Sequence, residues 1–243
     1  MAERLRLDRA LVERGLAGSR ERAHAMVRGG LVKVAGLPTT RPDQLVAAEE
    51  SIEVTGTDEF VSRGGIKLAA ALDAFGVPVA GRSALDVGAS TGGFTDALLR
   101  WGAARVIAVD VGYGQLAWEL RRDPRVIVLE RVNIRHLEQL PAPADLAVVD
   151  VSFISLRLVL PRIRKLLEPP GDVIALVKPQ FEVGKGAVGK GGVVRDPQLQ
   201  RHVLSELSSF ARSLDYEVAR ELESPLLGAK GNREFLLWLR PNG

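Results

Sequence analysis

Four charged residues fall where predicted helices and strands begin or end, and their types are suited to acid–base chemistry. They are Lys67, Asp150, Lys178 and Glu234. A doubly wound sheet binds ligands at the carboxyl ends of its strands, so charged residues at such positions predict a catalytic cleft. A lysine there can remove the proton of a hydroxyl nucleophile if burial and a second cation depress its pKa, or it can only stabilise the developing alkoxide. The two carboxylates would orient the ammonium groups, and the sequence leaves both roles of the lysine open.

A glycine-rich turn lies between a predicted strand and a predicted helix, in the segment Ala84-Leu-Asp-Val-Gly-Ala-Ser-Thr-Gly-Gly-Phe94. It is not the dinucleotide fingerprint, because Ser90 stands where the second glycine belongs. Asp110, at the end of the next strand, could accept hydrogen bonds from ribose hydroxyls, and Asp86 could lie near a cationic methionine group. A carboxylate beside a pyrophosphate would be repulsive. The pattern therefore favours a nucleoside cofactor without phosphates, which is S-adenosyl-L-methionine.

Alternating strand and helix patterns position these residues from residue 62 onward. Strands are predicted at 83–87, 105–109, 126–129, 145–149, 172–177, 216–221 and 234–239, and helices at 64–75, 93–101, 114–122, 155–167 and 197–213. Seven strands with intervening helices predict an α/β fold with an open, mostly parallel sheet. No helix pattern separates the last two strands, so we expect one antiparallel edge strand. This arrangement resembles the seven-stranded Rossmann-like (class I) methyltransferase sheet.

The first 55 residues predict a small α+β module. An apolar helical face that includes Leu5 ends at Gly15, and Ser19 can cap a second helix. Strand patterns at 31–34 and 51–54 then pair as in a hairpin. Residues 1–33 carry a net charge of +4, whereas residues 43–59 contain acidic residues and no basic one. We therefore predict three parts: a domain at 1–55, a linker at 56–63 and the α/β domain at 64–243.

The N-terminal module resembles the ribosomal S4-like RNA-binding domain. The resemblance rests on Arg6-Leu-Asp8, Ser19-Arg-Glu-Arg-Ala23 and Gly29-Gly-Leu-Val-Lys-Val34. It implies that basic residues of the second helix and the following strand contact RNA phosphates, which gives affinity with little sequence reading. The predicted RNA-binding residues are Arg4, Arg6, Arg20, Arg22, Arg28 and Lys33. A helical dimerisation cap is the alternative interpretation of this module.

The four charged residues resemble the Lys-Asp-Lys-Glu tetrad of the FtsJ-like ribose 2′-O-methyltransferases. The segments Ser62-Arg-Gly-Gly-Ile-Lys67, Asp150-Val-Ser-Phe-Ile-Ser-Leu156, Lys178-Pro-Gln-Phe-Glu182 and Gly231-Asn-Arg-Glu234 extend the resemblance to the hemolysin A (TlyA) family. It implies methylation of the ribose 2′-hydroxyl of cytidine in 16S or 23S rRNA or both, with ribosomal RNA or ribosomal subunits as the partner. The implied cofactor contacts are Gly88, Gly92 and Asp110, with Asp86, Ser90 and Asn133 as further candidates. The alternative is a non-catalytic RNA-binding factor in ribosome assembly.

A second glycine-rich segment, from Gly184 to Gly191, has the spacing of a P-loop. Gly191 stands where the P-loop needs a Ser or Thr to bind magnesium, so nucleotide hydrolysis is not favoured. We interpret the segment as a cationic lid over RNA phosphates.

Composition argues against several other classes of protein. The chain contains no cysteine, and His24, His136 and His202 belong to separate predicted elements, so we expect no metal site. No stretch approaches the ~18 apolar residues of a membrane span, and the N-terminus lacks the apolar core of a signal peptide. We therefore expect a cytoplasmic protein with no membrane partner, and the oligomeric state stays open.

Overall fold

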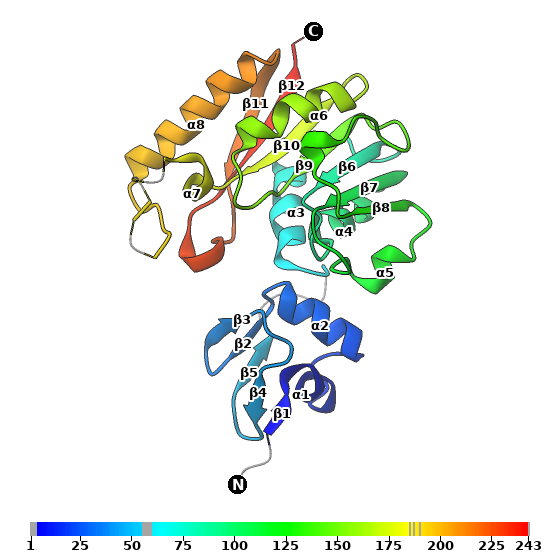
Figure 1. Ribbon diagram of the computed structural model, residues 1–243, viewed down its shortest axis with the longest axis vertical. Coiled ribbons are helices and arrows are strands. Elements are labelled where there is room, and N and C mark those ends of the chain that lie inside the picture. The colour runs from blue at the N-terminus through cyan, green and yellow to red at the C-terminus, as the bar shows by residue number, and fades with distance from the viewer. Residues whose placement is uncertain (1–3, 55–59, 185, 187, 190, 243) are drawn as a thin grey trace.

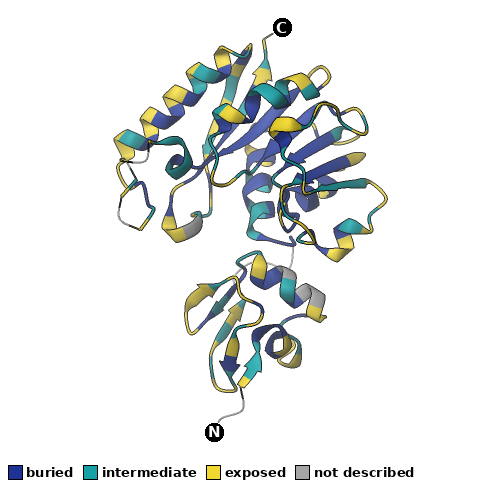
Figure 2. Cartoon of the chain, viewed as in Figure 1, coloured by how far each residue is buried: buried dark blue, intermediate teal, exposed yellow. Residues whose placement is uncertain are grey.

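The computed structural model describes residues 4–54, 60–184, 186, 188, 189 and 191–242, apart from the side chains of Glu21, Arg22, Ala25 and Ala229. Figure 1 shows a small N-terminal domain, in blue, below a larger domain built around a twisted sheet. The strands of the large sheet are mostly buried, whereas the helices expose their outer faces (Figure 2). The central sheet therefore forms the core of the large domain, and the helices separate it from solvent.

The N-terminal domain packs two helices against two small antiparallel sheets. Its elements are β1 (Arg4–Arg6), α1 (Leu7–Glu13), α2 (Arg20–Arg28), β2 (Val32–Val34), β3 (Leu37–Thr39), β4 (Leu45–Ala47) and β5 (Ile52–Val54). β2 lies between β3 and β5, with Val32 opposite Val54, so the predicted pairing of 31–34 with 51–54 is confirmed. Leu5 was expected on the first helix. It lies in β1 opposite Val46, because residues 4–6 are extended and pair with β4.

The large domain alternates strands with helices. Its strands are β6 (Ser83–Val87), β7 (Arg105–Asp110), β8 (Val126–Glu130), β9 (Leu146–Val149), β10 (Asp172–Val177), β11 (Tyr216–Glu223) and β12 (Phe235–Pro241). Its α-helices are α3 (Arg63–Phe75), α4 (Gly93–Arg100), α5 (Trp118–Arg121), α6 (Leu160–Leu166), α7 (Pro179–Glu182) and α8 (Pro197–Arg212). Short 3-10 helices lie at Ile134–His136, Leu156–Leu158 and Ala229–Gly231. All seven predicted strands are therefore present.

The strand order in the sheet is β11-β12-β10-β9-β6-β7-β8. Pairing is parallel from β10 to β8, and β12 is antiparallel to both β10 and β11. The sequence predicted an antiparallel strand at the sheet edge, which is wrong in position, because β12 lies one place inside. Burial explains the order: residues 235–237 of β12 are buried, whereas Tyr216 is the one buried residue of β11, which suits the edge.

Two predicted helices differ from those observed. The helix predicted at 114–122 is confined to Trp118–Arg121. The helix predicted at 155–167 begins as a 3-10 turn, and α6 starts only at Leu160, with a proline in its first turn. Proline at the start of a helix removes no hydrogen bond, so it suits this late beginning. The helix α7 was not predicted, because its four residues are too few to show a helical period.

The large domain is packed from residue 60 onward. The linker was predicted at 56–63, of which residues 56–59 lie outside the described part of the chain. Phe60 and Val61 are buried in the core beside α3 and α4. The Val61 amide donates a hydrogen bond to Asp96 Oδ2 at 2.9 Å. These contacts place residues 60–63 with the large domain, ahead of the boundary expected at residue 64.

Candidate active site

Asp150 and Lys178 form one ion pair at the carboxyl ends of neighbouring parallel strands. Asp150 directly follows β9 and Lys178 directly follows β10, and the register pairs Val149 with Ala175. Lys178 Nζ lies 2.5 Å from Asp150 Oδ1 and donates a hydrogen bond to Ser152 Oγ at 2.8 Å. The Lys178 side chain is 11% exposed and the Asp150 side chain 24%. The ammonium group is therefore held by two partners from the same loop.

Lys67 and Glu234 form the second ion pair. Lys67 lies in the first turns of α3, and Glu234 immediately precedes β12. Lys67 Nζ lies 2.5 Å from Glu234 Oε2, and the two side chains are 10% and 2% exposed. Gly228 makes room for this carboxylate, because a Cβ at residue 228 would lie 1.8 Å from Glu234 Oε1. Removal of one member would leave a buried charge unpaired, which is costly.

The two pairs meet at one cavity of about 310 Å³. Lys67, Asp150 and Lys178 line it, and Glu234 is joined to it through Lys67. Arg28 and Gly29 of the N-terminal domain also line this cavity. The structure thus brings together the four charged residues that the sequence predicted as a set, and adds Ser152, Gly228 and Arg28. Sequence reasoning missed the first two, although Ser152 stands only two residues after Asp150.

A larger cavity of about 1200 Å³ adjoins the first. Both are lined by Gly88, Ser90 and Asp150. Asp110 and Asn133 line the larger cavity only. Its remaining walls are largely apolar, with residues of β7 and of the segment that follows β9. Four of the six predicted cofactor residues therefore surround one space, which shares three lining residues with the cavity of the lysine–carboxylate pairs.

Asp110 and Asn133 already take part in hydrogen bonds with the backbone. Asp110 accepts from the Ser90 amide at 2.8 Å and from the Gly112 amide at 2.6 Å. Asn133 Oδ1 accepts from the Arg135 amide at 3.1 Å. A carboxylate has about four acceptor positions, so Asp110 retains capacity for ribose hydroxyls. The two amide contacts fix its orientation before any ligand binds.

Gly88 and Gly92 are required by close approach and by backbone conformation. Gly88 has φ of +86°, and a Cβ there would lie 2.4 Å from the carbonyl oxygen of Asp150. Gly92 has φ of +98°, and its Cβ would lie 2.3 Å from Leu120 Cδ1. Gly88 lines both cavities, whereas Gly92 lines neither. Cofactor contact by Gly92 stays a prediction, and the visible reason for glycine there is packing against α5.

Asp86 lies beneath the turn and outside both cavities. Its side chain is fully buried, and its Oδ2 accepts a hydrogen bond from Thr95 Oγ1 at 2.6 Å, whereas Oδ1 has no partner among the described residues. Burial raises the pKa of the Asp86 carboxyl to about 7, against the lowering effect of the Thr95 hydroxyl. In this conformation an effect of Asp86 on a ligand would pass through the turn rather than by contact.

Asp86→Asn is expected to remove a pH-dependent part of the stability. The folded-state pKa of Asp86 is about 7, above that of an unfolded aspartate, so the wild-type free energy of unfolding should fall as pH rises from about 4 to about 7. The loss should be on the order of 2–4 kcal/mol. Urea unfolding at pH 5 and pH 8 measures it. Asp73→Asn, an exposed position on α3, is the control and should follow wild type. Equal pH dependence in Asp86→Asn and wild type would contradict the assignment.

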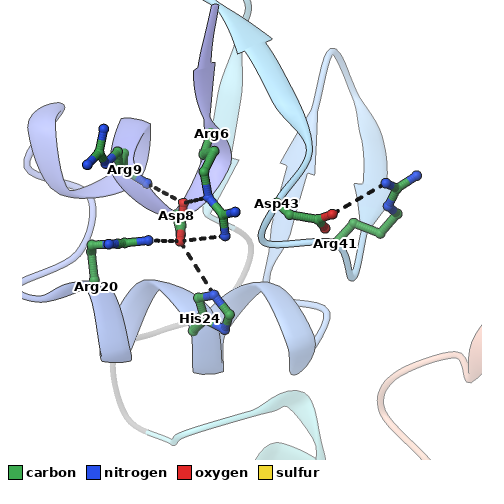
Figure 3. A network of polar contacts seen from close by, with 7 residues as sticks. All are labelled: Arg6, Asp8, Arg9, Arg20, His24, Arg41 and Asp43. Atoms are coloured by element: carbon green, nitrogen blue, oxygen red, sulfur yellow. Dashed lines mark hydrogen bonds and ion pairs between the residues drawn. The ribbon is translucent and has the colours of Figure 1, made fainter.

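The basic residues of the N-terminal domain are arranged by a buried carboxylate (Figure 3). Asp8 is fully buried and accepts hydrogen bonds from Arg6 at 3.1 and 3.2 Å and from Arg20 at 2.8 Å. His24 Nε2 lies 3.4 Å from the same carboxylate. Burial alone would raise the pKa of Asp8, but the hydrogen bonds and charges of Arg6 and Arg20 hold it well below its usual range. Asp8 therefore fixes Arg6 and Arg20 in one orientation.

The other predicted RNA-binding residues lie on three elements. Arg4 is exposed in β1, Arg28 is exposed at the end of α2, and Lys33 is half-buried in β2 opposite Glu53. The side chain of Arg22 lies outside the described residues. The proposed lid at 184–191 also falls partly outside them, because residues 185, 187 and 190 are not described. RNA binding at these positions stays a prediction.

Within 4–54, 60–184 and 191–242, no group of three or more histidine, aspartate or glutamate side chains is arranged to hold a metal ion. Among the helices described, none is both long and apolar enough to cross a membrane.

Comparison with known proteins identifies both domains. Residues 60–241 match the FtsJ-like methyltransferase family, and residues 5–52 match the S4 domain. A relative from Mycobacterium tuberculosis, named 16S/23S rRNA (cytidine-2'-O)-methyltransferase TlyA, is 51% identical over 99% of this chain and 91% of its own length. The chain belongs to the TlyA family of FtsJ-like methyltransferases. Its large domain is thus the methyltransferase domain, and its N-terminal domain is an S4 domain.

Two further proteins are similar to this chain over nearly its whole length. Hemolysin A from Brachyspira hyodysenteriae is 38% identical over 96% of this chain and 98% of that protein. A solved structure from Streptococcus thermophilus, which carries the name hemolysin, superimposes with a TM-score of 0.77 at 40% identity. The match covers 99% of this chain and 90% of that one. The similarity to these two proteins therefore covers both the S4 domain and the methyltransferase domain.

Proposed function

We propose that this protein transfers a methyl group from S-adenosyl-L-methionine to the ribose 2′-hydroxyl of cytidine in 16S or 23S ribosomal RNA or both. The observation that carries the proposal is the pair of lysine–carboxylate contacts at the place where a small cavity opens to a larger one. The relative from M. tuberculosis is named for this reaction and is 51% identical. A ribosomal substrate would also place the activity in the cytoplasm.

The larger cavity, of about 1200 Å³, has room for the cofactor and a lining of suitable chemistry. Gly88 and Ser90 form its floor at the turn, and Asp110 supplies a carboxylate that its amide contacts already orient. Asn133 also lines this cavity, and its side-chain NH₂ can donate to polar groups of the nucleoside. The apolar walls suit the adenine ring. When bound, S-adenosyl-L-methionine supplies a methyl group on a positively charged sulfur, which a ribose oxygen can attack.

The smaller cavity would hold the ribose of the target nucleotide. The 2′-hydroxyl is a poor nucleophile at neutral pH, so its proton must leave as the oxygen forms its bond to the methyl carbon. Asp150 and Ser152 fix Lys178 Nζ at the cavity. As a neutral amine, Lys178 would receive that proton and become an ammonium group, whereas as an ammonium group it would only stabilise the oxygen as negative charge develops. Lys67, fixed by Glu234, supplies a second positive charge on the same cavity. Glu234 holds Lys67 from outside the cavity, whereas Asp150 holds Lys178 and itself lines both cavities.

The S4 domain would bring the RNA to this cavity. Arg6 and Arg20 are oriented by Asp8, and Arg28 reaches the cavity of the two lysines. Arginine contacts to phosphates give affinity that depends on salt and little on sequence. A non-catalytic assembly factor would need the S4 domain but would have no use for two buried lysine–carboxylate pairs beside a nucleoside-sized cavity.

The test is methyl transfer from labelled S-adenosyl-L-methionine to isolated 30S and 50S subunits from cells that lack the modification. We expect label in ribosomal RNA, at a ribose that becomes resistant to alkaline cleavage. Label on a base, or on ribosomal protein, would reject ribose methylation. Cofactor binding by calorimetry, measured in parallel, separates an inactive site from a wrong substrate. Failure to bind the cofactor would favour the assembly-factor alternative.

A further inference from the structure

A third cavity of about 590 Å³ lies between the S4 domain and the methyltransferase domain. Arg20, His24 and Arg28 of α2 line one side, and Trp118 and Arg121 of α5 line the other. In Figure 1, α5 lies at the end of the methyltransferase domain that faces α2. A Cβ at Gly30 would lie 3.7 Å from Arg63 Cδ, so the end of α2 also approaches the start of α3. We call this cavity the interdomain groove.

The interdomain groove is cationic. Its described lining residues include three arginines and a histidine and no carboxylate. Arg121 is paired with Glu130, and Arg20 with Asp8, so both guanidinium groups are fixed and still line the groove. Arg28 is exposed, and no hydrogen bond or ion pair to it is found among the described residues. Such a surface attracts a polyanion.

Trp118 gives the groove an exposed aromatic face. The residue is 58% exposed, whereas Trp101 is stacked on Phe60 and Trp238 on Phe75. Thus the other two tryptophans are used in packing and Trp118 is not. The Arg122 guanidinium lies 5.7 Å from its ring centre. An exposed indole among arginines is the combination on which unpaired nucleotide bases stack while their phosphates are neutralised.

The interdomain groove adjoins the smaller cavity lined by Lys67 and Lys178, which we call the catalytic cavity. Arg28 lines both, and it therefore stands between Trp118 on one side and Lys67 and Lys178 on the other. If one nucleotide of a single RNA strand occupied the catalytic cavity, the phosphate next to that nucleotide would lie beside Arg28. The next nucleotides along the strand would then lie in the groove.

We propose that the interdomain groove binds the unpaired RNA nucleotides that flank the methylated one, with a base stacked on Trp118 and phosphates on Arg20 and Arg28. This inference rests on the proposed function, because it takes RNA as the substrate. It adds a second RNA contact on the methyltransferase domain itself, at a helix that carries neither the cofactor turn nor a catalytic residue. The flanking segment must be single-stranded, since a paired base offers no free face to an indole.

The test compares binding of unmodified ribosomal subunits by wild type, Trp118→Ala, Trp118→Phe and Arg28→Ala in a filter assay over a range of salt. Trp118→Ala should weaken binding roughly 5- to 100-fold, because stacking on an aromatic residue contributes that much per base. Trp118→Phe should restore most of the affinity, since it retains an aromatic face. Arg28→Ala should weaken binding and reduce the salt slope by about one. Arg212→Ala, an exposed arginine at the end of α8, is the matched control and should bind like wild type.

Two outcomes would overturn the inference. Wild-type binding by Trp118→Ala would show that no base stacks there, and equal losses in Trp118→Ala and Trp118→Phe would show that the aromatic face is not what matters. Thermal unfolding and cofactor affinity of each variant exclude a general loss of structure. Filter binding needs no chemistry, so failure of the groove is distinct from failure of the proposed function, which would appear as wild type that binds subunits but transfers no methyl group to ribose.

Discussion

Lys178→Ala is expected to lower kcat for methyl transfer roughly 10²- to 10⁴-fold, the range that a positioned proton-transfer group contributes. The substitution removes the ammonium group that Asp150 and Ser152 hold at the catalytic cavity. Affinity for ribosomal subunits should stay within about threefold, because one cation in a small cavity adds little to a salt-dependent interface. Single-turnover transfer of labelled methyl groups measures the first quantity and filter binding the second. A large loss of RNA affinity with kcat retained would contradict the assigned role.

Lys178→Arg separates the two roles that a lysine can have here. Arginine keeps the positive charge but cannot lose a proton near neutral pH. If Lys178 stabilises charge, Lys178→Arg should recover a measurable part of the rate lost in Lys178→Ala. If it accepts the proton, both variants should be equally inactive. Lys165→Ala, an exposed lysine at the end of α6, is the control and should retain wild-type activity.

Gly88→Ala is expected to abolish measurable cofactor binding and to lower the free energy of unfolding by roughly 3 kcal/mol. A Cβ at residue 88 would lie 2.4 Å from the backbone oxygen of Asp150, which cannot move aside as a side chain could. The positive φ of +86° adds strain for any residue with a Cβ. The turn would have to shift away from Asp150, which would displace the wall that Gly88 contributes to both cavities. Urea unfolding and calorimetric titration with the cofactor measure the two effects.

Gly81→Ala is the matched control for backbone strain. Gly81 has φ of +78°, but a Cβ there would meet no atom within 4 Å. It should therefore lose only the roughly 1–2 kcal/mol of the left-handed conformation and bind the cofactor normally. If Gly88→Ala resembled Gly81→Ala in both measurements, the close approach of the turn to Asp150 would have no functional weight.

Lys67 and Glu234 are less suitable than Lys178 for testing the chemistry by substitution. Lys67 and Glu234 are both nearly buried, so substitution of either alone leaves an uncompensated charge and confounds catalysis with stability. Asp150, the group that remains in Lys178→Ala, is 24% exposed, so water can reach it. Lys178 is therefore the better position at which to separate chemistry from folding.

The sequence by itself predicted most of the strands and helices, and the element ends that carry the candidate catalytic residues. Strand patterns such as 83–87 and 172–177 coincide with β6 and β10, because burial of consecutive apolar residues is encoded locally. The positions of Asp150 and Lys178 at strand ends followed from the same local patterns. Seven strands, the glycine turn and the S4-like segment therefore required no knowledge of long-range contacts.

Only the tertiary structure decided which residues meet. Lys178 pairs with Asp150 because β9 and β10 are neighbours in the sheet. Lys67 pairs with Glu234 because β12 lies between β10 and β11 and brings Glu234 to α3. No local pattern encodes this strand order. Asp86 lies on the central strand β6, of which residues 84–87 are all buried, so its side chain is inside the protein. Its place in the motif had suggested contact with a ligand. Arg28 reaches the catalytic cavity and the interdomain groove through the arrangement of two domains. Periodicity within one element specifies which face is buried, whereas contacts between distant elements depend on strand order and packing, which the whole chain sets together.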